Sequence, residues 1–93
     1  MHESKMSDEI SEMIKIKSKN SPDEKVKIIV SLDEGASLEG AKRDLAEQGL
    51  EIENAIPGPI PFVSGSVSIS RVSEVAAVKA VKKVERDSEI HAL

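Results

Sequence analysis

The segment Lys-Val-Lys-Ile-Ile-Val-Ser-Leu (KVKIIVSL, residues 25–32) decides how the surrounding chain folds. Its apolar side chains alternate with the others, so that one side of the extended segment carries Val26, Ile28, Val30 and Leu32. A period of two residues is typical of a strand with one face against a hydrophobic core. The segment therefore predicts a strand that covers a core, with Ile29 on the opposite face.

The residues after this strand predict a capped helix. Ser37 is well placed as the N-cap of a helix that runs to about Gln48, and Gly49 follows in the position where glycine commonly ends a helix. The expected inward stripe is Leu38, Ala41, Leu45 and Ala46. Gly40 is expected to weaken this helix unless it permits close packing on the sheet.

Four further elements and one rigid loop follow. Residues 50–56 predict a strand with Leu50, Ile52 and Ile56 on one face, and residues 57–61 contain three prolines that cannot donate to a strand ladder. Residues 62–69 predict a strand with Gly65 as a possible bulge. Residues 72–80 predict a helix that faces the sheet through Val72, Val75, Ala76 and Val78, and residues 81–86 predict the last strand.

The order of these elements is strand, helix, strand, strand, helix, strand. In about 65 residues this order predicts an α+β, ferredoxin-like βαββαβ sandwich, in which two helices cover one face of a four-stranded antiparallel sheet. The other face, which would include Ile29, is left open. We therefore expect this face to be a candidate docking surface.

The first 24 residues are more polar than the rest of the chain. Ser7, Asp8 and Glu9 resemble a helix start, after which Ile10, Met13 and Ile14 fall on one face. We expect residues 1–24 to form a flexible or partly helical N-terminal arm, with a partner-binding helix as the alternative. The folded domain is expected at residues 25–93, with a C-terminal tail at residues 87–93.

Composition excludes several classes of function. The 93 residues carry a net charge of −4, one Phe and no Trp, Tyr or Cys. This composition argues against a nucleic-acid surface, which needs clustered basic residues and aromatic stacking platforms. No apolar run is long enough to span a membrane, and no export signal is present at the start of the sequence.

The sequence offers no set of residues for catalysis. It has no nucleophile with supporting His and Asp, no glycine-rich phosphate loop and no His or Cys cluster. The two histidines, His2 and His91, are far apart in sequence, and a metal site needs three or four converging ligands. We therefore expect neither an enzyme nor a bound metal or cofactor.

The closing segment VKKVERDSEIHAL, residues 81–93, carries a family resemblance. Together with the opening KVKIIVSLDEG and the helix that ends at Gly49, it resembles the propeptide of subtilisin-like serine proteases and the stand-alone inhibitors built on the same domain. The closing segment is similar to the family's V-x-x-V-E-x-D strand, which a tail follows. The resemblance covers residues 25–93.

This resemblance implies a mode of inhibition. The open sheet face would pack on two surface helices of the protease, where Glu85 and Asp87 would cap the helix N-termini. The tail would lie in the substrate cleft like a cleaved product, with Leu93 in the primary specificity pocket and Ile90 in the apolar fourth subsite. His91 and Ala92 would lie along the cleft between them.

The resulting expectation is an inhibitor of a subtilisin-like serine protease, monomeric when free. It would also be an intramolecular chaperone if the chain is joined to a protease domain. The alternative is a ferredoxin-like regulatory or dimerisation module that binds a small ligand or its own copy. We expect a cytoplasmic location if the chain is complete as written and an extracellular one if it is an excised propeptide.

Overall fold

The computed structural model describes residues 6, 8–20 and 23–87 of the chain. Its elements, in chain order, are α1 (Asp8–Asn20), β1 (Lys25–Leu32), α2 (Leu38–Glu47), β2 (Glu51–Ile56), β3 (Phe62–Ser68), the 3₁₀ turn η1 (Ile69–Arg71), α3 (Val72–Ala76) and β4 (Val81–Arg86). The four expected strands are present, and the described helices number three.

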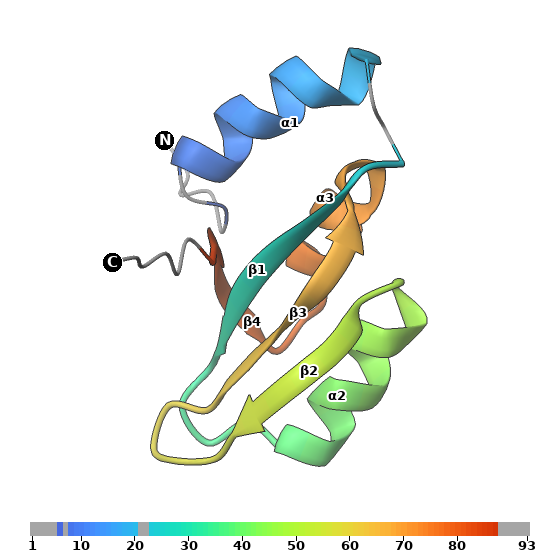
Figure 1. Cartoon of the computed structure of the whole chain (residues 1–93). Coiled ribbons are helices and arrows are strands. Elements are labelled where there is room, and N and C mark those ends of the chain that lie inside the picture. The colour runs from blue at the N-terminus through green and yellow to red at the C-terminus, as the bar shows by residue number, and fades with distance from the viewer. Residues whose placement is uncertain (1–5, 7, 21–22, 88–93) are drawn as a thin grey trace, which may run out of the picture.

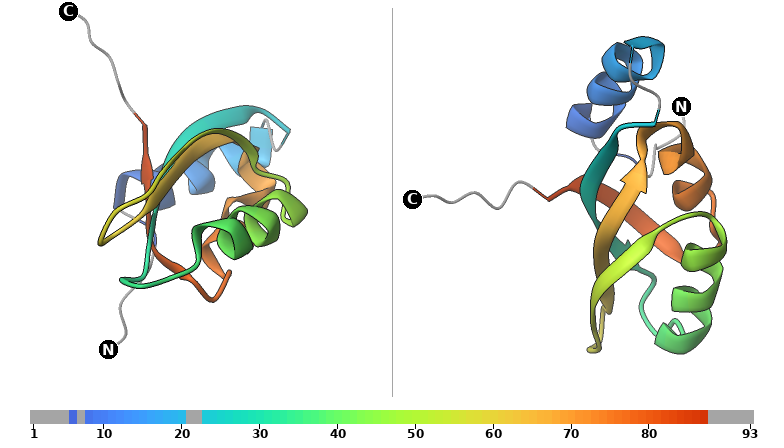
Figure 2. Two further views of the ribbon diagram at one scale, coloured as in Figure 1. Left: turned by 90° about the horizontal axis from the view of Figure 1, so that it is seen from below. Right: turned by 45° about the vertical axis from the view of Figure 1, so that its right-hand side comes forward.

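The strands form one open antiparallel sheet in the order β2-β3-β1-β4. Helices α2 and α3 lie on one side of this sheet, and no described element covers the other side (Figure 2). The protein is therefore α+β, and its arrangement is compatible with the expected ferredoxin-like sandwich. Helix α1 lies at one end of the sheet, beyond α3 (Figure 1).

The core forms between the sheet and the helices. Ile28, Val30 and Leu32 are each 0% exposed, which confirms the face predicted for β1. They pack with buried residues of the other strands and of α2 and α3 in one cluster. Because the chain has one aromatic residue, this core consists of branched aliphatic side chains and Ala.

Both predicted ends of α2 are confirmed. The Ser37 side-chain oxygen accepts a hydrogen bond from the Gly40 N–H at 3.2 Å, which satisfies one of the free donors of the first turn. Gly49 has a φ of +99°, the left-handed conformation in which glycine has no steric penalty. Ala41 and Leu45 are buried as expected, whereas Ala46 is exposed.

The predicted inward direction of Ile56 is wrong. The pairing of β2 with β3 shifts by one residue between Ile52 and Asn54, so the alternation of β2 changes phase at this point. As a result Ala55 is half-buried against the core and Ile56 is 49% exposed. The bulge expected at Gly65 lies in β2, opposite that glycine.

The second predicted helix is shorter than expected. Helix α3 ends at Ala76 rather than near residue 80, and two turns follow, in which the Val78 N–H bonds to the Val75 carbonyl and the Val81 N–H to the Val78 carbonyl. Val72, Val75 and Ala76 are buried as predicted.

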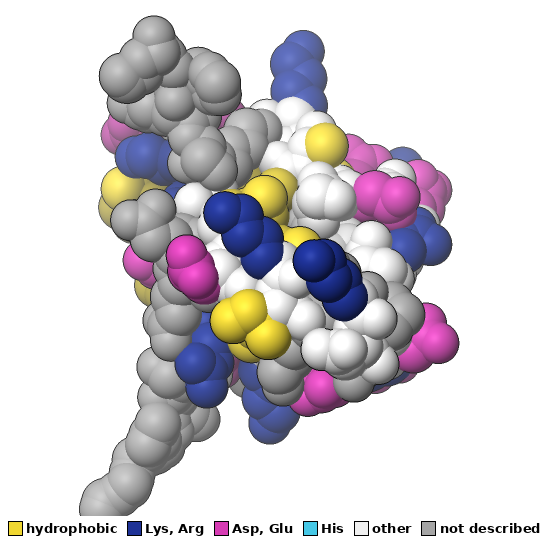
Figure 3. All heavy atoms as spheres, turned by 90° about the horizontal axis from the view of Figure 1, so that it is seen from above, with side chains coloured by type: hydrophobic (Ala, Val, Ile, Leu, Met, Phe, Trp, Pro, Cys, Tyr) yellow, Lys and Arg dark blue, Asp and Glu magenta, His cyan; other side chains and the backbone are white. Residues whose placement is uncertain are grey.

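Helix α1, which lies within the expected N-terminal arm, packs on the rest of the folded chain. Ile10 of α1 is 0% exposed and belongs to the central cluster, and Met6 forms a parallel bridge with Val84. Helix α1 contacts β4 and η1. Figure 3 views the molecule from the end at which α1 lies. On the surface that it shows, hydrophobic side chains lie in small groups among charged ones.

Candidate functional site

The open face of the sheet is built from residues that pair across the strands, because directly paired residues place their side chains on the same face. We call this surface the docking face. One row across it, from β2 to β4, contains Ile56, Phe62, Ser31 and Lys83, and the next contains Asn54, Ser64, Ile29 and Glu85. A third row contains Glu51, Ser66 and Lys27.

The centre of the docking face has small or half-buried side chains. Ile29, Ser64 and Ser66 are all of intermediate exposure. Toward β2 the face carries two glutamates: Glu51 forms an ion pair with Lys25, and Glu53 accepts a hydrogen bond from the Ser66 hydroxyl at 3.4 Å. These surface pairs contribute little to stability, so a partner could displace them at low cost.

Glu85, for which the family resemblance implies a contact with a protease, lies on the docking face. It pairs with Ile29 of β1, and its side chain is 48% exposed. Its carboxylate lies 3.4 Å from the Lys83 ammonium group. The carboxylate is therefore accessible, with a weak surface ion pair as its competing interaction.

Asp87 continues the same face beyond the end of β4. Its N–H donates to the Lys27 carbonyl at 2.9 Å, which extends the pairing with β1 by one residue. Because alternate strand residues share a face, Glu85 and Asp87 lie side by side, roughly 7 Å apart along the strand. The four predicted cleft residues, Ile90, His91, Ala92 and Leu93, lie outside the described residues.

The sequence reasoning missed an apolar group at the hairpin between β2 and β3. Ile56, Ile60 and Phe62 are 49%, 44% and 41% exposed, and we call them the hairpin patch. Ile56 and Phe62 are directly paired across the two strands, and Ile60 lies between two prolines in the connecting loop. The proline-rich loop was a usable signal, since an isoleucine held between prolines has no ladder to join.

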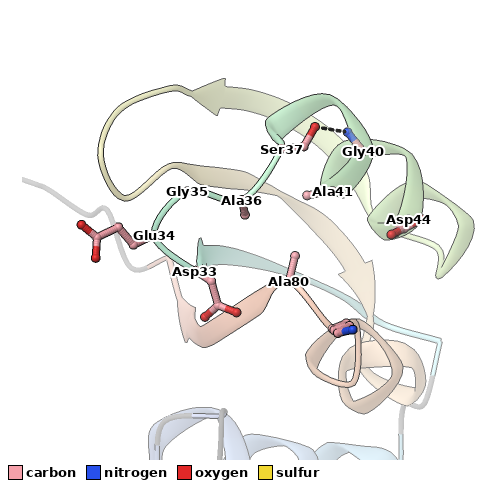
Figure 4. A pocket seen from close by; sticks show the side chains of 10 residues that line it. Asp33, Glu34, Gly35, Ala36, Ser37, Gly40, Ala41, Asp44 and Ala80 are labelled. Carbon is pink, nitrogen blue, oxygen red and sulfur yellow. Dashed lines mark hydrogen bonds between the residues drawn. The ribbon is translucent and has the colours of Figure 1, made fainter.

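A hollow of about 420 Å³ lies at the N-terminal end of α2. Its lining includes Asp33, Glu34 and Asp44, opposed by Lys79 alone (Figure 4). The helix donor that faces Ser37 is already used by that side chain. The acidic lining therefore disfavours an anion. The hollow adjoins the start of β4, whereas Glu85 and Asp87 lie at the end of that strand.

Within residues 6, 8–20 and 23–87, no three His, Cys, Asp or Glu side chains are grouped to hold a metal ion. None of the helices in that part of the chain is long and apolar enough to cross a membrane.

Comparisons of the chain with protein-family models, with curated proteins and with solved structures found no match. The resemblance to subtilisin propeptides therefore depends on the residues of this chain alone.

Proposed function

We propose that this protein inhibits a subtilisin-like serine protease, with the docking face against the protease surface and the C-terminal residues in the substrate cleft. One observation carries the proposal: Glu85 and Asp87 share the uncovered face at the end of β4, directly before the chain enters residues 88–93. Contact with the protease and entry into the cleft would therefore use consecutive parts of one segment.

The platform for this function is a ferredoxin-like βαββαβ unit. The strand order β2-β3-β1-β4 supports this assignment, as does the position of α2 and α3 on one side of the sheet (Figure 2). In this arrangement β4 is an outer strand of the sheet, with Met6 as its described neighbour on the far side. The end of β4 therefore lies at an edge of the sheet.

Two kinds of interaction would provide the affinity. A carboxylate at the N-terminus of a protease helix accepts from free N–H groups and meets the positive end of the helix dipole, which contributes about 1 kcal/mol per cap. Leu93 and Ile90 would each contribute about 1.5 to 3 kcal/mol on burial, before the costs of ordering the tail.

Titration of several subtilisin-like proteases with the intact chain tests the proposal. Hydrolysis of a small peptide substrate is followed while mass spectrometry monitors residues 88–93. We expect competitive inhibition, strongly weakened by deletion of Ala92 and Leu93 without loss of the folded circular dichroism spectrum. Absence of inhibition by the folded chain across the panel would reject the function, and undiminished inhibition by the deletion variant would reject the role of the tail.

A second function is favoured by the apolar side chains on the docking face. Ile29, Ile56 and Phe62 lie on a surface that no described element covers, as in a regulatory module that pairs with its own copy or binds a small ligand. This function predicts a dimer in solution that persists after deletion of Leu93. Light scattering over a range of protein concentrations distinguishes this dimer from the monomer expected of the inhibitor.

A further inference from the structure

The hairpin patch is a large apolar feature at one end of the docking face. Its three side chains are each exposed to between 41% and 49%, and they come from consecutive parts of one hairpin. Of the four large hydrophobic residues exposed in the described part of the chain, the fourth is Ile16 of α1, which lies on another element. The group covers roughly 250 Å², an area that a soluble monomer can expose, so its position at the end of the docking face, and not its size, points to an interaction site.

Two residues of the patch, Ile56 and Phe62, belong to the same surface as the two carboxylates. Phe62 pairs with Ser31, which pairs in turn with Lys83, two residues before Glu85. With strands about 4.8 Å apart and a rise of about 3.4 Å per residue, Phe62 lies roughly 12 Å from Glu85 and roughly 17 Å from Asp87. A single flat partner surface could therefore contact both ends of the docking face.

A second copy of the chain fits this patch poorly. Contact between two patches alone would bury roughly 250 Å² on each copy, against about 800 Å² per partner in a standard interface. A two-fold axis along the strands through the centre of the face would enlarge the contact but place Ile56 over Lys83. An axis through the patch and the opposite corner would bring the patches together, but it would also bring each Asp87 against its symmetry mate.

The geometry of the hairpin favours a partner that meets it without rearrangement. Three prolines lie between Ile56 and Phe62, and the Pro61 carbonyl accepts from the Leu32 N–H at 2.9 Å. Fixed backbone angles and this hydrogen bond reduce the entropy that the loop would lose on binding.

We propose that the hairpin patch is a second anchor on the target protease and determines which protease this chain inhibits. This inference depends on the proposed function. The target would carry an apolar surface site roughly 12 to 17 Å from the helix N-termini that Glu85 and Asp87 cap. Proteases that have the cleft and the two helices but lack this site would be inhibited more weakly.

The test compares the wild-type chain with the triple variant Ile56→Thr, Ile60→Ser, Phe62→Thr on a panel of subtilisin-like proteases. Thr suits the two strand positions, and all three side chains are substantially exposed, so the fold should persist in circular dichroism. Ile16→Ser is the matched control, because Ile16 is 61% exposed and lies on α1. For the best-inhibited protease we expect the inhibition constant to rise about 10- to 100-fold in the triple variant and less than about 3-fold in the control. For the other proteases, the inhibition constant of the triple variant should exceed that of the wild-type chain by a smaller factor.

Each other result has a distinct meaning. If the wild-type chain inhibits, and the folded triple variant inhibits each protease as strongly as the wild-type chain does, the anchor is rejected and the proposed function stands. If the folded wild-type chain inhibits none of the proteases, both are rejected. If light scattering shows a wild-type dimer that the triple variant loses, the occupant of the patch is a second copy, and the anchor is again rejected.

Discussion

The backbone of Glu51 lies so close to Gly65 that any side chain at position 65 would collide with it. A Cβ atom on Gly65 would lie 2.9 Å from the Glu51 carbonyl carbon, and it would be closer still to the carbonyl oxygen. Gly65 is paired with Ile52, directly before the register shift in β2. The glycine therefore permits the bulge, and the bulge turns Ile56 toward the docking face.

Gly65→Ala should destabilise the protein by about 1 to 3 kcal/mol, because the added methyl group meets backbone atoms that cannot move aside without disturbing the pairing of β2 with β3. Urea unfolding measures the loss. Gly40→Ala is the control: its Cβ would meet the Ser37 side chain at an ordinary 3.5 Å, so improved helix propensity should stabilise the protein by up to about 1 kcal/mol. Equal stability of Gly65→Ala and wild type would contradict the close approach.

Ile10→Ala should cost about 2 to 5 kcal/mol, since Ile10 is fully buried in the central cluster. Ile16→Ala, on the same helix at 61% exposure, should change the free energy of unfolding by no more than about 0.5 kcal/mol. Denaturant unfolding compares the two variants. Similar small effects for both would show that α1 does not contribute to the core in solution.

Ser37→Ala should lower the free energy of unfolding by about 1 kcal/mol, because the Gly40 N–H loses its acceptor at the start of α2. Ser37→Asp supplies another acceptor and should retain most of the stability. Thermal unfolding of the three proteins gives the comparison. A loss in Ser37→Asp as large as in Ser37→Ala would argue against capping as the cause.

Glu85→Gln and Asp87→Asn keep an oxygen acceptor but remove the negative charge that would meet the positive end of a helix dipole, so each should raise the inhibition constant about 2- to 5-fold on an inhibited protease. Glu51→Gln is the matched control, because it removes an acidic charge from the β2 side of the same face. Inhibition kinetics at low and moderate salt would show the difference. An effect of Glu51→Gln equal to that of the other two would indicate general electrostatic attraction instead of helix capping.

The local features of the fold could be read from the sequence because their causes are local. Alternation over residues 25–32 predicted the buried face of β1, and Ser37 and Gly49 marked the ends of α2. The pattern VKKVER predicted β4. Glu85 and Asp87 share a face for an equally local reason, since they lie two residues apart in a strand and its extension.

Only the tertiary structure decided the direction of Ile56, the burial of Ile10 and the short length of α3. The direction of Ile56 depends on a register shift between β2 and β3. The alternation of residues within one strand cannot predict how that strand pairs with its neighbour. Ile10 is buried because β4 and η1 lie beside α1, although the polar residues around it suggested an arm. The sequence by itself determined which segments extend or coil, and the packing between segments determined which of their side chains remain available to a partner.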